Sequence, residues 1–531
     1  MTRWSCARLL PLALLFFGGA AICAQGPAAG GPTPEAPPPE TLQRIVSLLT
    51  GDDLAGAAAA ADAALVRFPE DSVLHNLAGV IAARRGAPAP AEEHFRTAIR
   101  LAPAAAAPYE NLARLYQEQS GTDSAARGKA LEVYEQLLRI APDHVEALYQ
   151  SALLRALGAE FEASRSLLAR LPETVRRRPQ ALAVLVAALA GLGEADGAHA
   201  AAERLAVHPD LTAADVAAIA PAFDRAENRR AAQVVLEALD RRGLGTPALL
   251  HRLGRLYAVG DRLADARQVL DRAAQAHPSV PVLLDLARVT ARQGDYKAVL
   301  GYLAHARALD PGSAEVHFMF GMACVELNLG REAHESLMNA VTLAPDNALV
   351  NYAMGAVSLH RHDPSEAIPY FERYVELKPA DPRGRFALGA ARFYSHQFDR
   401  ARADLEQAAR VPETAAGAHY FLARIARQFN ELDEAGREVE RALQINPSYP
   451  DAWAELGLVQ LRRREYDAAQ RSLEKALALD PDNYAAAVNL ATLYARTGDP
   501  RRDAQEARLA ELQEKRAIAA QEFLRIVEVV P

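Results

Sequence analysis

Large apolar residues, small residues and prolines recur along this chain in one fixed order, which is clearest in the segment AWAELGLVQLRRREYDAAQRSLEKALALDP. In a 34-residue frame that starts at Pro450, large residues hold positions 4, 7 and 24, small residues hold positions 8, 20 and 27, and proline holds position 32. These residues are Trp453, Leu456, Leu473, Gly457, Ala469, Ala476 and Pro481. The pattern predicts a structural unit that ends at the proline.

The same order returns in other parts of the chain. Prolines follow one another at gaps of 33 to 35 residues, namely Pro278, Pro311, Pro345, Pro379, Pro412, Pro447 and Pro481. One further copy of the frame contains Leu253, Gly254, Tyr257, Ala266, Leu270 and Ala273, and another contains Phe320, Gly321, Ala333, Leu337 and Ala340. Several residue types that recur in register indicate one unit copied many times.

This unit resembles the tetratricopeptide repeat, a helix-turn-helix module of the same period. The resemblance implies two antiparallel helices that approach closely at the small positions, while the large residues fill the space between them. Proline at position 32 ends the second helix because it lacks a backbone donor. Since one helix pair cannot bury its own apolar face, the pairs must stack. We therefore expect an all-α, right-handed superhelical solenoid of about 13 or 14 helix pairs.

The units are not equally regular. We expect N-terminal repeats over residues 41–143, degenerate repeats over 144–246, regular repeats over 247–483, and a partial repeat with a capping helix over 484–531. Between Tyr109 and Pro142, five additional residues lie where the turn between the two helices belongs, which predicts a longer turn. An unrelated helical insert is the alternative for residues 144–246, where helical periodicity persists but few of the characteristic positions are kept.

The two ends differ from the middle. Residues 1–24 carry Arg3 and Arg8 ahead of the apolar run LLPLALLFFGGAAI, which is typical of a signal peptide cleaved after Ala24. An uncleaved membrane anchor is one alternative, and a lipoprotein at Cys23 fits poorly because Ile22 precedes it. Residues 25–40 are rich in Pro and Gly and predict an unfolded linker. At the other end, the apolar stretch FLRIVEVV predicts either packing on the last repeat or a docking tail.

Composition and chemistry narrow the functional classes. The formal net charge is −8, which argues against nucleic acid as a main partner. Cys324 is the one cysteine outside residues 1–24, and we expect it to be buried in a first helix, which excludes an intrachain disulfide in the mature chain. No catalytic, phosphate-binding or cofactor motif is found. His360 and His362 form an HxH triplet without a third metal ligand, so we expect solvated turn residues and no metal.

The resemblance also implies where partners bind. In this family the first helices line a concave groove, largely through positions 2, 5, 9, 12 and 13. Position 5 is aromatic in four successive units, and we define these four residues as the aromatic ladder: Phe318, Tyr352, Phe386 and Tyr420. Near the ladder the same projection places Met322, Leu359, Phe393, Tyr394, Arg288, Arg292, Arg424, Arg427 and Arg462. Aromatic anchors flanked by arginine suit a peptide or helical segment with apolar and acidic groups.

Two alternatives remain open at this point. The aromatic ladder can line the groove, or it can fill gaps between neighbouring first helices. The family's clamp for acidic C-terminal peptides has asparagine at position 9, whereas this chain has Arg288, Met322, Ala356, Ala390 and Arg424 there, which makes that mode of recognition doubtful.

We expect a non-enzymatic scaffold that binds protein partners in the bacterial cell envelope, in the periplasm or anchored to the membrane by an uncleaved N-terminal segment. Contact with a membrane would then come only through this segment or through a partner. An accessory subunit that presents a glycan or peptide substrate to a separate enzyme is the alternative function. Catalysis within residues 144–246 is a third hypothesis, which the alanine-rich sequence there disfavours.

Overall fold

The computed structural model describes residues 36–119, 124–224 and 229–528, with side chains as far as residue 515. Across these ranges the chain forms 30 helices and no strand, so the predicted all-α class is confirmed. It divides into two compact units, Met1–Leu256 and Tyr257–Pro531. The predicted signal peptide and most of the linker lie outside the described residues. Across the described part of the chain, no helix combines the length and the hydropathy that a bilayer span requires.

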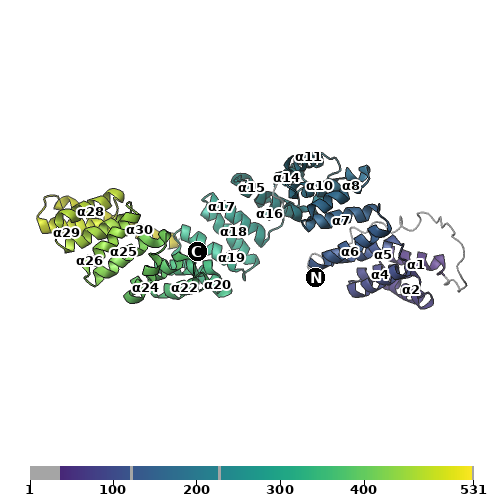
Figure 1. Cartoon of the computed structure of the whole chain (residues 1–531), viewed down its shortest axis with the longest axis horizontal. Helices are drawn as coiled ribbons and strands as arrows, with labels where there is room; N and C mark the ends of the chain where they lie inside the picture. Colours follow the sequence, from purple (N-terminus) through teal and green to yellow (C-terminus); the bar gives the residue numbers. More distant parts are fainter. Residues whose placement is uncertain (1–35, 120–123, 225–228, 529–531) are drawn as a thin grey trace. The chain divides into compact units, whose positions relative to one another are not determined.

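In the first unit, most of the longer helices pack as antiparallel pairs with the next helix along the chain (Figure 1). The helices are α1 (Pro39–Thr50), α2 (Leu54–Arg67), α3 (Ser72–Arg84), α4 (Pro88–Leu101), α5 (Ala106–Gln119), α6 (Ser124–Ile140), α7 (Val145–Leu157), α8 (Phe161–Arg170), α9 (Glu173–Arg176), α10 (Pro179–Gly191), α11 (Ala195–Ala206), α12 (Ala213–Ala217), α13 (Ala220–Phe223) and α14 (Arg229–Arg241). α15 (Pro247–Val259) spans the boundary between the units.

Two details of this unit differ from a regular array of repeats. The additional residues before Pro142 do not all lie in a turn, because Ser124–Gly128 belong to α6, which has 17 residues. Within residues 144–246 the pairs α7–α8 and α10–α11 pack as hairpins, but α9, α12 and α13 have only four or five residues each. These short helices interrupt the regular alternation where the sequence keeps few of the characteristic positions.

The second unit alternates first and second helices without interruption. They are α16 (Leu263–Ala276), α17 (Val280–Arg292), α18 (Tyr296–Leu309), α19 (Ala314–Glu326), α20 (Gly330–Leu343), α21 (Ala348–His360), α22 (Pro364–Leu377), α23 (Pro382–Tyr394), α24 (Phe398–Ala408), α25 (Pro412–Gln428), α26 (Leu432–Ile445), α27 (Pro450–Arg462), α28 (Tyr466–Leu479), α29 (Tyr484–Thr497) and α30 (Arg502–Glu528).

The small residue at position 8 explains how closely the two helices of a pair approach. A Cβ atom added at Gly457 on α27 would lie 2.5 Å from Cγ of Leu473 on α28, which holds position 24. At Gly321 the corresponding distance to Cγ of Leu337 is 2.7 Å. Both leucines are fully buried. The predicted pairing of a small residue with a large one across each hairpin is therefore confirmed at these positions.

The turn inside each pair uses one left-handed residue, which recurs every 34 positions. Gly294 has φ 79°, Asn328 56°, His362 61° and Arg464 66°. Left-handed backbone is costly for residues other than glycine, and asparagine tolerates it better than most. The turn position is thus fixed by geometry more than by residue type. His362, one of the two HxH histidines, is a turn residue of this kind.

Position 4 has a second role that the residue pattern did not indicate. Trp453 Nε1 donates a hydrogen bond of 2.9 Å to the carbonyl of Pro447, the proline at position 32 of the preceding unit. Tyr109, Asn351, His317 and His75 make the same contact, each with a proline carbonyl six residues earlier. Position 4 therefore favours large side chains with a polar tip, because they satisfy a carbonyl at the turn between repeats.

First helices of successive repeats contact one another directly, as α19 does with α21, α21 with α23, α23 with α25, α25 with α27, and α27 with α29. Successive second helices are connected by polar side chains, as His334 on α20 is with Glu366 on α22 at 2.7 Å and Tyr302 on α18 with Asp271 on α16 at 3.0 Å. The first helices therefore form the inner layer of the second unit. At its end, α30 packs on α29, with Leu512 buried and Gln505 Nε2 donating to the carbonyl of Ala487 at 3.1 Å.

Candidate functional site

The aromatic ladder lies on four consecutive first helices, α19, α21, α23 and α25, and all four side chains are half-buried. Tyr352 packs against the rings of Phe371 and Tyr374 on α22, at centroid distances of 5.6 and 5.0 Å. Each ring thus buries part of its surface against neighbouring helices and leaves part exposed. The packing role is therefore seen in the structure, whereas the groove role of the exposed part stays a prediction.

The ladder continues across α23 and α25 through ring contacts. Phe386 on α23 lies 5.9 Å from Phe421 on α25, and a Cβ atom added at Gly417 would lie 2.8 Å from the Phe386 ring. Tyr420 lies 5.4 Å from Phe421 and 5.2 Å from Tyr449, the residue that precedes α27. Phe421 and Tyr449 were not among the predicted residues, because neither holds one of the five groove positions.

Three of the remaining projected apolar residues, Met322, Leu359 and Phe393, are half-buried, whereas Tyr394 at the end of α23 is 46% exposed. Phe393 lies 5.4 Å from Phe421 and 5.7 Å from Phe398. Tyr394 contacts the rings of Phe393 and Phe421 edge-on, at 5.3 and 5.9 Å. Tyr394 therefore lies at the rim of a cluster of aromatic side chains from α23 and α25.

Arg424 on α25 lies in the middle of this cluster. Its guanidinium carbon is 4.5 Å from the ring centroid of Phe393 and between 5.4 and 5.5 Å from those of Tyr394, Tyr420 and Phe421. Nη1 donates a hydrogen bond of 3.3 Å to the hydroxyl of Tyr394. A cation over several ring faces is held by their quadrupoles. We call Arg424 with Phe393, Tyr394, Tyr420, Phe421 and Tyr449 the aromatic nest.

The other projected arginines have protein partners. Arg288 forms ion pairs with Asp285 at 2.7 Å and with Glu315, and Arg292 pairs with Asp261 at 2.7 Å. Arg427 is paired with the buried Glu455. Arg462 is exposed and its Nη1 lies 3.4 Å from the carbonyl of Arg427. These contacts connect adjacent helices, so most of the predicted basic rim already serves the packing of the repeats.

A polar cavity lies outside the predicted residues, where the repeat becomes irregular. α24 has 11 residues, whereas α22, α26 and α28 have 14, and Pro412 begins α25 instead of following the end of a second helix at position 32. Next to the shortened helix lies a cavity of about 350 Å³. It is lined by Arg402, Glu406, Ala409, Arg410, His419, Leu422, Ala426, Glu434, Glu438 and Arg441.

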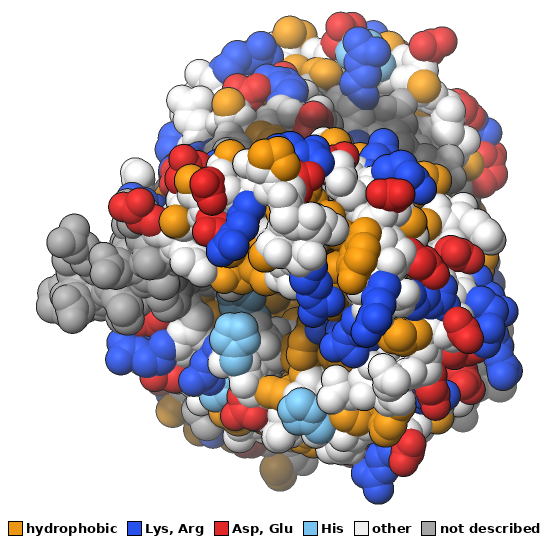
Figure 2. All heavy atoms as spheres, turned by 90° about the vertical axis from the view of Figure 1, so that its left-hand side faces the viewer, with side chains coloured by type: hydrophobic (Ala, Val, Ile, Leu, Met, Phe, Trp, Pro, Cys, Tyr) orange, Lys and Arg blue, Asp and Glu red, His pale blue; other side chains and the backbone are white. Residues whose placement is uncertain are grey.

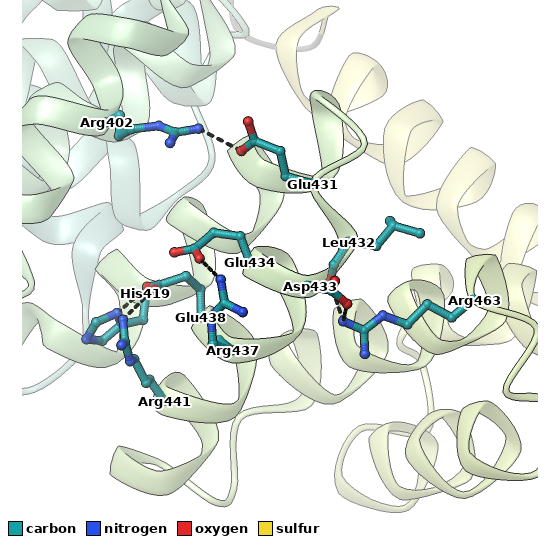
Figure 3. A network of polar contacts seen from close by, with 10 residues as sticks. All are labelled: Arg402, His419, Glu431, Leu432, Asp433, Glu434, Arg437, Glu438, Arg441 and Arg463. Atoms are coloured by element: carbon teal, nitrogen blue, oxygen red, sulfur yellow. Dashed lines mark hydrogen bonds and ion pairs between the residues drawn. The ribbon is translucent and has the colours of Figure 1, made fainter.

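Ion pairs hold the walls of this cavity (Figure 3). His419 Nδ1 lies 2.6 Å from Oε2 of Glu438, and Arg441 pairs with the same carboxylate. Burial raises the pKa of Glu438, but the contacts with His419 and Arg441 outweigh it and hold that pKa below its usual value. Arg402 reaches Glu431 at 3.2 Å. The cavity is thus lined by fixed charges of both signs.

The described residues contain neither an exposed cysteine nor a cluster of metal ligands. Cys324 is fully buried, as predicted, and burial raises the pKa of its thiol to about 12. Over the described ranges, no group of three or more His, Cys, Asp and Glu side chains is arranged to hold a metal ion. Figure 2 shows acidic and basic side chains interspersed with hydrophobic ones on the face that it views.

Stacked helix pairs with a partly exposed aromatic inner layer define the class of α-helical repeat scaffolds for protein interactions. Family models of the tetratricopeptide repeat match residues 42–106, 318–382 and 386–450, and a second model of the same repeat matches 460–507. These segments of the chain are tetratricopeptide repeats. No curated protein sequence matches the chain.

Solved structures with similar folds include APC/C Cut9-Hcn1, at 13% identity over 86% of this chain and 96% of that chain, with a TM-score of 0.40. Yeast Tom70 is 15% identical over 82% and 98% of the two chains, with a TM-score of 0.32. Pseudomonas aeruginosa pilF is 22% identical over 41% and 97%, with a TM-score of 0.34. These scores are low, so the family assignment rests on the repeat models and the helix pairs.

Proposed function

We propose that this protein is a scaffold of the bacterial cell envelope that binds segments of partner polypeptides along the inner layer of its second unit. The observation that carries this proposal is the aromatic ladder together with the aromatic nest. Partly exposed aromatic side chains are held on rigid, consecutive first helices, and such anchors dominate protein-recognition surfaces. The apolar run behind Arg3 and Arg8 supports export, although it lies outside the described residues.

Site-specific photocrosslinking tests the binding surface. Tyr394 is replaced by p-benzoylphenylalanine in the full chain, and the chain is irradiated in cells and in envelope extracts. The matched control carries the same residue at Ile445 on the second helix α26, which is 48% exposed and outside the inner layer. We expect a defined set of proteins to be captured from position 394 and not from 445. Identical capture from both positions, or none from 394, contradicts the proposal.

Cell fractionation tests the location separately. The full chain is expressed with a C-terminal tag and followed in cytoplasmic, periplasmic and membrane fractions. We expect it in the periplasm with its first 24 residues removed, or in the membrane with them retained. A wholly cytoplasmic chain with an intact N-terminus contradicts the envelope assignment without affecting the binding surface.

An accessory subunit that presents a glycan is the second candidate, and the polar cavity beside α24 favours it. Guanidinium and carboxylate groups line about 350 Å³, and together they supply both donors and acceptors for hydroxyl groups. An oligosaccharide array probed with the full chain and with Glu434→Ala separates the two functions. Glu434 lines the cavity without being buried as Glu438 is, so its loss should leave the fold intact. Glycan binding that the variant loses supports the accessory function.

A further inference from the structure

Among the predicted groove arginines, Arg424 and Arg462 form no ion pair with a described carboxylate, and of these two only Arg424 is half-buried. Its only hydrogen bond to a described residue goes to the hydroxyl of Tyr394, and no described carboxylate lies within ion-pair distance. The two acidic residues of neighbouring α27 are engaged elsewhere. Asp451 accepts a hydrogen bond of 2.8 Å from Asn483, and Glu455 is paired with Arg427.

The hydroxyl groups around Arg424 add donors and no charge. Tyr420 and Tyr449 stand 5.2 Å apart by ring centroid, and neither hydroxyl has a hydrogen-bond partner among the described residues. Burial raises the pKa of Tyr449 to about 12, so its hydroxyl keeps its proton at neutral pH and can donate. A guanidinium with two phenol donors beside it is complementary to a carboxylate, which accepts several hydrogen bonds at once.

We propose that the aromatic nest binds an acidic segment of a partner protein, with an Asp or Glu carboxylate on Arg424 and a neighbouring apolar side chain on Tyr394. This inference rests on the proposed function and names the chemistry of its partner. Charge complementarity favours the acid, because the nest contains a cation without a counterion. The exposed ring of Tyr394 at the rim favours an apolar side chain next to it.

A peptide array tests the inference with defined probes. It contains C-terminally amidated 12-residue peptides with one central Glu beside Leu or Phe, each with a Gln twin. Binding of the strongest pair to the full chain is then measured by fluorescence polarisation. We expect the Glu peptide to bind wild type about tenfold more tightly than its Gln twin, as charge-assisted hydrogen bonds provide. Equal binding of the two peptides, or no binding by any peptide, overturns the inference.

Variants locate the effect. We expect Arg424→Gln to bind the Glu and Gln peptides equally. Arg424→Lys keeps the charge and should retain part of the preference for the Glu peptide. Arg288→Gln is the matched control, because it also holds position 9 of its repeat but is already paired with Asp285 and Glu315. It should keep the full tenfold preference. Circular dichroism of each variant checks that the helices remain folded. A preference that survives in Arg424→Gln overturns the inference.

The outcomes also distinguish this inference from the proposed function. If position 394 crosslinks to partners but acidic and amide peptides bind equally, the scaffold function stands and the acidic preference fails. If neither crosslinking nor peptide binding is seen, both fail. The strongest pair is also prepared with a free C-terminal carboxylate. A preference that appears only in that form overturns the inference, because it assigns the anion to a chain end instead of a side chain.

Discussion

His75 on α3 and His94 on α4 face each other across a hairpin of the first unit, with their Nδ1 atoms 3.1 Å apart and their ring centroids 5.4 Å apart. His75 Nε2 donates to the carbonyl of Pro69 at 2.9 Å, because a carbonyl can only accept. The Nδ1 atom of neutral His75 is therefore an acceptor, and His94 Nδ1 must carry the proton between them. Protonation of both rings would place two positive charges head to head.

This pair predicts that the first hairpins lose stability in mild acid. Burial lowers the pKa of His94, and the nearby His75 lowers it further. Since the folded pKa lies below the unfolded value of about 6.5, the unfolded chain binds more protons as the pH falls through that range. Neutral His94 therefore makes its full contribution to folding stability above a pH of about 6.5. This contribution is lost as the pH falls towards the pKa of His94 in the folded chain.

Hydrogen exchange in α3 and α4, corrected for the intrinsic effect of pH on exchange, measures this loss. We expect protection to fall between pH 7 and 5 in wild type and to fall less in His94→Gln. His277→Gln is the control, since His277 is exposed and its side chain forms no hydrogen bond or ion pair with described residues. The prediction is wrong if His94→Gln and His277→Gln follow the same pH dependence.

A second prediction concerns the closest approach of two helices. Gly457→Ala places a methyl group 2.5 Å from Cγ of the fully buried Leu473, which cannot move without disturbing the hairpin. Overpacking of this kind typically costs about 1–3 kcal/mol. Gly301→Ala on the exposed side of α18 is the matched control, because no atom lies within 4 Å of the added Cβ. It should stabilise the helix by about 1 kcal/mol.

Urea unfolding followed by circular dichroism distinguishes the two substitutions. The midpoint should fall for Gly457→Ala and rise slightly for Gly301→Ala. Equal shifts in the same direction would mean that helix propensity, and not the approach to Leu473, decides the effect at position 8.

A third prediction follows from the turn geometry. Arg464 has φ 66°, is exposed, and its side chain forms no hydrogen bond or ion pair with described residues. Glycine removes the left-handed cost of about 1–2 kcal/mol, while its greater freedom in the unfolded chain cancels about 0.5–1 kcal/mol. We expect Arg464→Gly to stabilise the second unit by about 0.5–1 kcal/mol. The converse change Gly294→Ala, at the equivalent turn with φ 79°, should destabilise it, and thermal melting measures both.

The sequence predicts the helix pairs well because their determinants are local and repeated. The glycine and leucine of positions 8 and 24 recur in register, so the approach of Gly457 to Leu473 follows from the residue pattern alone. The left-handed turn could not be predicted in the same way, because its residue changes from Gly294 to Asn328 to Arg464 while the backbone stays the same.

The candidate site was predicted only in part, because ring contacts depend on neighbours outside the five groove positions. Phe421 and Tyr449 complete the aromatic nest, and no position rule indicates them. The pairing of Arg288 with Glu315, of Arg292 with Asp261 and of Arg427 with Glu455 was equally hidden, since these acids lie on other turns and helices. The position of Pro412 did indicate an irregular repeat, because it lies 33 residues after Pro379 and 35 residues before Pro447. The cavity beside the shortened α24 lies at this repeat.

The contacts of the aromatic ladder lead to the last prediction, which separates packing from binding. Tyr352 and Phe386 each pack on aromatic rings of a neighbouring helix while part of their surface stays exposed. Truncation of a fully buried Phe or Trp costs about 3–5 kcal/mol, so half-buried rings should cost about 1–3 kcal/mol each. Tyr352→Ala and Phe386→Ala are therefore expected to lower the melting temperature as well as partner capture.

Tyr394→Ala should behave differently, because Tyr394 is 46% exposed and lies at the rim of the aromatic nest. Its loss removes the hydrogen bond from Arg424 and one ring contact to the guanidinium but leaves the other rings of the nest in place, so the loss of stability should be smaller than for the half-buried rings. We expect capture of partner peptides to fall by more than the small decrease in melting temperature explains. If all three variants lose capture only in proportion to their loss of stability, the aromatic side chains serve the stacking of repeats, and the binding surface lies elsewhere.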